Sequence, residues 1–64
     1  MFEVFAETTD GSVEIIPFAS EDDAIACMVR LEALHEHVRL TLCSDGLPIL
    51  VGVRVDGCWS FAKP

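Results

Sequence analysis

The first 29 residues of this chain contain no lysine and no arginine, although seven acidic residues lie there. From Arg30 to Pro64 four basic residues balance four acidic ones, so the first 29 residues carry the whole net charge of −7. Phosphate binding relies on positive charge, and this balance argues against direct nucleic-acid binding. It favours a protein partner with a basic surface, because opposite charges steer proteins together.

The sequence also lacks the spacings that mark common catalytic and metal sites. It has no Cys-x-x-Cys pair, and its three cysteines, Cys27, Cys43 and Cys58, are odd in number and widely spaced, which argues against a disulfide framework. His35 and His37 lie two residues apart near the predicted end of the helix. One interpretation is a solvated helix end, and the alternative is a metal or thiol site formed by the two histidines and a cysteine. No glycine-rich phosphate loop is present. We therefore expect no enzymatic activity, no metal and no cofactor.

No apolar run is long enough to span a bilayer, and residues 1–6 lack the basic start and apolar core of a signal peptide. The expectation is a cytoplasmic protein with a single domain over residues 1–64. Such a short chain buries only about 60% of its unfolded surface, so we expect its stability to be marginal or to be increased by self-association. With 52% apolar residues, some apolar surface remains exposed and favours an interface.

Three Asp-Gly dipeptides, at 10–11, 45–46 and 56–57, lie between apolar or β-branched runs. This dipeptide favours a two-residue type I′ turn, in which both central residues take a positive φ, and each therefore predicts a hairpin. The predicted cross-strand pairs are Glu7 with Glu14, Phe5 with Ile16 and Glu3 with Phe18; Leu42 with Ile49, Leu40 with Val51 and Val38 with Val53; and Val55 with Cys58, Arg54 with Trp59 and Gly52 with Phe61.

Residues 20–36 have the pattern of a helix. Ser20 is a favourable N-cap, and Glu21, Asp22 and Asp23 follow in the first turn, where the helix dipole favours acids. An apolar stripe at helical spacing follows, consisting of Ala24, Cys27, Met28, Leu31, Leu34 and His35. The helix is predicted to end near Glu36 or His37.

The predicted fold class is α+β, a two-layer β-β-α-β-β-β domain with an antiparallel sheet and one helix packed on one face. Because side chains alternate along a strand, the registers also predict which residues face the helix. Those residues are Phe2, Val4, Ala6, Val13, Ile15, Val38, Leu40, Leu42, Ile49, Val51, Val53 and Val55. The opposite face is the candidate functional surface, with Glu3, Phe5, Glu7, Glu14, Ile16 and Phe18 from the first hairpin and Arg39, Thr41, Leu50, Gly52, Arg54, Trp59 and Phe61 from the others.

Like charges directly opposite each other destabilise a hairpin, so the predicted Glu7–Glu14 pair suggests carboxylates placed for arginine or lysine of a partner. The alternative is that solvent screens the repulsion between the two carboxylates and the fold merely tolerates the pair. The predicted partner-binding residues are Glu3, Phe5, Glu7, Glu14, Ile16 and Phe18, with Glu21, Asp22 and Asp23 as an adjacent acidic rim. A second hypothesis is a structural or regulatory homodimer that buries the open sheet face, with Arg54, Trp59 and Phe61 in the interface.

The segment VRLTLCSDGLPILVGVRVDGCWSF, residues 38–61, looks like the turn-linked strands that close some very small phage proteins. With the preceding hairpin and helix, the whole chain resembles certain anti-CRISPR inhibitors in size, strand order and turn placement. The resemblance implies a non-enzymatic protein in the host cytoplasm that binds an effector complex, often over its nucleic-acid channel. We therefore expect a small acidic protein-binding inhibitor of a nucleic-acid-handling complex, with mimicry of nucleic acid as one route.

Overall fold

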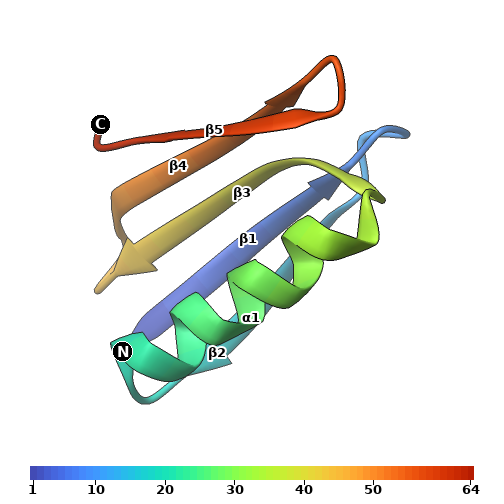
Figure 1. Cartoon of the computed structure of the whole chain (residues 1–64). Coiled ribbons are helices and arrows are strands. Elements are labelled where there is room, and N and C mark those ends of the chain that lie inside the picture. Colours follow the sequence, from blue (N-terminus) through green and yellow to red (C-terminus); the bar gives the residue numbers. More distant parts are fainter.

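A computed structural model describes residues 1–64 and has the predicted order of strands and helix (Figure 1). The fold is α+β, with one helix packed against an open antiparallel sheet whose strand order is β2-β1-β3-β4-β5. No helix has the length and hydrophobicity needed to cross a membrane. The elements are β1 (Phe2–Thr8), β2 (Val13–Phe18), α1 (Glu21–Leu34), β3 (His37–Ser44), β4 (Leu47–Val55) and β5 (Cys58–Ala62).

The core lies between α1 and two adjacent inner strands of the sheet, β1 and β3. Strand alternation sends every second side chain of these strands toward the helix, where Ala24 and Met28 meet them. Burial of these apolar side chains is the main favourable contribution to folding. The buried cluster contains Val4, Ala6, Ala24, Met28, Leu40 and Leu42, and the half-buried Phe2, Phe18, Leu31, Ile49, Leu50 and Trp59 pack against it.

The helix begins as predicted and ends earlier than predicted. The Ser20 side chain accepts a hydrogen bond from the Asp23 backbone N–H at 3.2 Å, which caps the first turn. The last helical residue is Leu34, because His35 takes a left-handed conformation with φ of 56° and reverses the chain direction. Leu34, which was predicted to belong to the buried stripe, is 55% exposed.

The register predicted for the first hairpin is wrong by one residue. Glu7 pairs with Val13 rather than with Glu14, because residues 9–11 form a three-residue loop. The Gly11 N–H donates to the Thr8 carbonyl at 3.1 Å, and Gly11 is the one residue of the loop with a positive φ. This is the pattern of a type I turn followed by a left-handed glycine. The slip moves Glu14, Ile16 and Phe18 to the helix side and Val13, Ile15 and Pro17 to the open side.

The loop keeps this form because the Asp10 carboxylate bridges it. The carboxylate accepts hydrogen bonds from the Ser12 backbone N–H, at 2.9 Å, and from the Thr8 hydroxyl. Those hydrogen bonds favour the ionised form and lower the pKa of Asp10 to about 2. An aspartate that bonds the backbone two residues further on is itself a turn device, and here it competes with the type I′ turn predicted from Asp-Gly.

The second hairpin keeps its predicted turn but not its predicted register. Asp45 and Gly46 both have positive φ, as a type I′ turn requires. Beyond Cys43, however, a bulge gives β4 one extra residue, so Leu42 pairs with Leu50 and not with Ile49. The bulge follows Pro48, which has no N–H to give to the ladder; prolines within sheets sit at such bulges or at edges.

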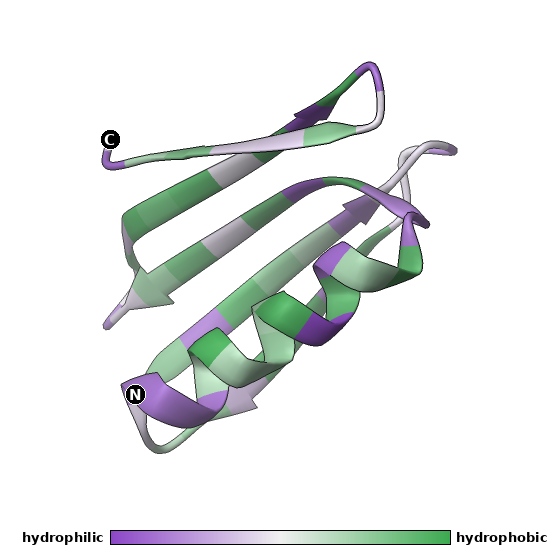
Figure 2. Cartoon of the chain, viewed as in Figure 1, coloured by the Kyte–Doolittle hydropathy of each residue, from purple (hydrophilic) through white to green (hydrophobic).

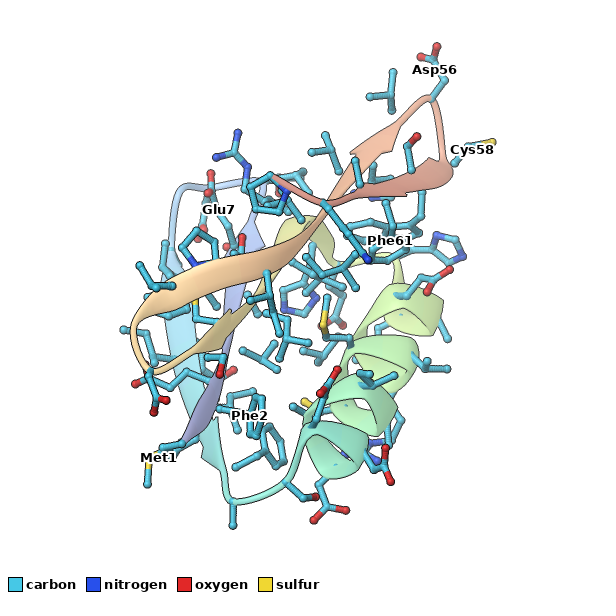
Figure 3. All side chains as sticks on the ribbon, turned by 90° about the vertical axis from the view of Figure 1, so that its left-hand side faces the viewer. Met1, Phe2, Glu7, Asp56, Cys58 and Phe61 are labelled. Atoms are coloured by element: carbon cyan, nitrogen blue, oxygen red, sulfur yellow. The ribbon has the colours of Figure 1, made fainter.

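The bulge decides which face each residue of β4 and β5 occupies. The third hairpin has its predicted register, with Gly52 opposite Phe61 and Arg54 opposite Trp59. Because the bulge turns Gly52 toward the helix side, Phe61 follows it there. Figure 3 shows Phe61 on that side of the sheet and Glu7 pointing away on the other. The open face instead receives Val51, Val53 and Val55, which the sequence had placed inside.

Candidate functional site

The nine predicted partner-binding residues divide over three places. Glu3, Phe5 and Glu7 lie on the open face of the sheet, as predicted. Glu14, Ile16 and Phe18 lie on the helix side of the edge strand β2, where Phe18 packs against the core. Glu21, Asp22 and Asp23 are exposed at the start of α1. The predicted Glu7–Glu14 carboxylate pair is therefore absent, because the two side chains point to opposite faces.

Arg54, Trp59 and Phe61 are not on the open face where the homodimer hypothesis had placed them. The Trp59 indole N–H donates to the Glu32 carbonyl at 3.2 Å, and Arg54 Nε donates to the His37 carbonyl at 2.7 Å. The rings of Trp59 and Phe61 are stacked with centroids 5.8 Å apart. The Trp59 bond joins the β4–β5 hairpin to α1, and the Arg54 bond joins it to the start of β3, so these side chains have a structural role in this fold.

Almost none of the negative charge is neutralised within the molecule. The one ion pair joins the terminal ammonium of Met1 to Asp45 at 2.8 Å, and that ammonium lowers the pKa of Asp45. None of the four basic side chains is paired with a carboxylate. The acidic side chains of the first 29 residues therefore remain available to an external cation.

A groove runs between α1 and the β4–β5 hairpin, beginning beside the acidic first turn of the helix. Its largest hollow, about 500 Å³, has an apolar floor with Glu21 and Lys63 at the rim. The bulge in β4 builds this floor, because Ile49 and Leu50 both pack on the helix side. The hollow is lined by Glu21, Ile25, Leu42, Pro48, Ile49, Leu50, Lys63 and Pro64.

The groove continues along the helix. A second hollow of about 180 Å³ shares Ile25 and Leu50 with the first and extends to Phe61. The helix contributes Ile25 and Val29 to this wall, two exposed apolar residues outside the predicted buried stripe. Figure 2 shows the hydrophilic first turn of α1 next to a largely hydrophobic middle of the helix. The unbroken apolar run from Ala24 to Val29 is the sequence signal that could have indicated a second apolar side of the helix.

The histidines and cysteines are dispersed. No group of three or more His, Cys, Asp or Glu side chains is placed to hold a metal ion. His35 is exposed at the helix end, whereas His37 is buried on β3. All three cysteines are free; burial and the nearby negative charge of Glu3 raise the pKa of the Cys43 thiol. A raised pKa reduces the thiolate fraction and hence the nucleophilicity of that sulfur.

The chain was compared with protein-family models, with curated proteins and with solved structures. None of the three comparisons found a match.

Proposed function

We propose that this protein is a non-catalytic protein-binding module that docks onto a basic surface of another protein. The observation that carries the proposal is the uncompensated charge: a net charge of −7 with a single ion pair, made by the terminal ammonium. Unpaired carboxylates on a small rigid domain attract a basic partner and accelerate its encounter.

The contact surface that fits this role best is the acidic end of the groove. Protein interfaces gain most of their affinity where an anchor side chain fills a desolvated pocket surrounded by polar groups. The hollow beside Glu21 offers an apolar floor made by Ile25, Ile49 and Leu50, and Asp22 and Asp23 lie exposed in the same helical turn. The matching partner element is an apolar side chain flanked by arginine or lysine.

A protein that handles nucleic acid is the partner class with the most suitable surface. Such proteins carry clusters of lysine and arginine that neutralise phosphates, and a carboxylate surface can occupy the same groups. The layout of the chain, which resembles some anti-CRISPR inhibitors, supports the same class. On this proposal the protein inhibits its partner by covering the phosphate-binding surface.

Charge reversal at the groove, compared with a matched reversal elsewhere, tests the proposal. The test variant is E21K/D22K, and the control is E14K/E36K, which alters the net charge equally at residues that do not line the large hollow. Each tagged variant is used to capture proteins from a bacterial lysate, and captured proteins are then challenged with a duplex oligonucleotide.

We expect wild type and the control to retain nucleic-acid-binding proteins that the oligonucleotide releases, and E21K/D22K to lose them. Circular dichroism checks that each variant is folded, since lysine in the first helical turn opposes the dipole. Equal capture by E21K/D22K would reject the groove as the contact surface. Capture that the oligonucleotide leaves unchanged would reject competition with nucleic acid.

A further inference from the structure

The open face of the sheet carries apolar side chains on β2 and β4 that nothing in the monomer covers. An antiparallel sheet with one wet face normally alternates apolar and polar residues along each strand. Here β2 is exposed at Val13 and Ile15, which are 54% and 53% accessible, and two of its three inner side chains, Ile16 and Phe18, are apolar as well. Strands that are apolar on both faces are typical of sheets covered on both sides.

The cross-strand pairs arrange this face in three rows that run from β2 to β4 or β5. The first row contains Val13, Glu7, Arg39, Val53 and Ser60; the second contains Ile15, Phe5, Thr41, Val51 and Ala62; the third contains Pro17, Glu3, Cys43 and Pro48. The three charged residues of these rows, Glu3, Glu7 and Arg39, lie on β1 and β3, and every row residue on the flanking strands β2 and β4 is apolar.

Arg39 is the basic residue of this face, and it is a direct cross-strand neighbour of Glu7. The two side chains form no ion pair within the monomer. A two-fold axis parallel to the strands, between β1 and β3, places Arg39 of one copy over Glu7 of the other, twice by symmetry. This row of the face is thus complementary in charge to itself, which is the requirement of an isologous interface. Glu3, the other charged residue of the face, comes to lie over Cys43 of the second copy.

The same axis matches the apolar flanks. It superposes β2 of one copy on β4 of the other, so that Val13 lies over Val53 and Ile15 over Val51. Two sheets in this arrangement form an aligned β-sandwich about 10 Å thick, in which inner side chains interdigitate. A shallow hollow of about 290 Å³ over Phe5 and Thr41 gives the opposing side chains room to enter.

The axis places β2 over β4 and β1 over β3, so four strands of each copy overlap and β5 stays outside. Strands about 4.8 Å apart and about 20 Å long give these four strands a projected area of about 380 Å² per copy, or about 770 Å² for the two copies together. This area lies below that of a standard specific interface and in the range of weak, concentration-dependent ones. From the apolar residues on β2 and β4 and the Glu7–Arg39 arrangement, we infer that the protein forms a weak two-fold homodimer through the open sheet face.

The dimer leaves the groove on the outer, helix side of each copy, so this inference does not depend on the proposed function. A second copy is the occupant that the face itself indicates, because both members of each ion pair come from the same sequence. A dimer also presents two acidic grooves at once, and bivalent binding increases the apparent affinity for a partner with repeated sites.

Light scattering coupled to size exclusion measures the state of the full chain over a range of concentrations. We expect wild type to approach twice the monomer mass of 7.0 kDa. E7R and R39E each oppose like charges across the interface and are expected to raise the dimer dissociation constant about ten-fold or more, while E7R/R39E restores it. E14R, which reverses a charge on the other face of the sheet, is the matched control.

I15D places a charge within the apolar flank and is expected to yield a monomer with an unchanged circular dichroism spectrum, since Ile15 is exposed in the monomer. Three outcomes would overturn the inference. Wild type could remain monomeric at the highest concentration, I15D could dimerise like wild type, or E7R/R39E could dimerise no better than the single variants. The last result would reject the Glu7–Arg39 arrangement on which the two-fold axis rests.

Discussion

The aromatic ring of Phe61 on β5 lies over Gly52 on β4 and fills the space that a Cβ at position 52 would need. Glycine in a strand often marks such a close approach. This relationship keeps the ring on the helix side, where it forms part of the groove wall and stacks on Trp59. The pair was predicted from the sequence, but on the other face of the sheet.

G52A should therefore destabilise the protein. The added methyl group collides with the Phe61 ring, and overpacking of this kind costs about 1–3 kcal/mol. Urea denaturation of wild type, G52A, F61L and G52A/F61L measures the interaction. We expect the double variant to lose less stability than the sum of the single variants, because leucine gives the new methyl group room. Strict additivity would contradict the contact.

L40A should be among the most damaging core substitutions. The Leu40 side chain is fully buried between the sheet and α1, and leucine-to-alanine changes at such sites cost about 2–5 kcal/mol. L47A is the matched control, since Leu47 is 70% exposed next to the β3–β4 turn. Thermal and urea unfolding should show a large loss for L40A and a change within about 0.5 kcal/mol for L47A.

Acid should weaken the first hairpin through Asp10. Its pKa in the folded protein, about 2, lies below the ordinary value of 3.8, so ionised Asp10 stabilises the fold above that ordinary value. This stabilisation is lost as the pH falls from about 4 toward about 2. D10N removes the titrating group and should show a smaller decrease in melting temperature over that pH range than wild type. Equal decreases would mean that the carboxylate does not bridge the loop in solution.

The three thiols should react at different rates with iodoacetamide. Cys58 is exposed beside the β4–β5 turn, whereas Cys27 and Cys43 are buried. The raised pKa of Cys43 further reduces its thiolate fraction near neutral pH. Peptide mass mapping over time should find Cys58 modified first and Cys43 late. Rapid modification of Cys43 in the folded protein would show that the reagent reaches this thiol more readily than its burial indicates.

The order of strands and helix, the start of α1 and the third hairpin were predictable because their causes are local. Ser20 caps its own helix, and Asp56-Gly57 sets the pairing of the strands on either side. Positive φ values at both turn residues and a hydrogen bond within four residues need no distant partner. The central pairs of the buried layer follow from the period of two along β1 and β3.

The faces of the outer strands were decided only by the tertiary structure. The Asp10 side chain lengthens the first loop by one residue, and the bulge after Pro48 adds one residue to β4. Each single-residue change exchanges the two sides of a strand, since successive side chains point oppositely. Neither the longer loop nor the bulge alters the order of the strands and helix or the net charge, so the sequence by itself determined the fold and the net charge. The positions of Ile15, Val51 and Phe61, and with them the groove and the open apolar face, depended on pairing across the sheet.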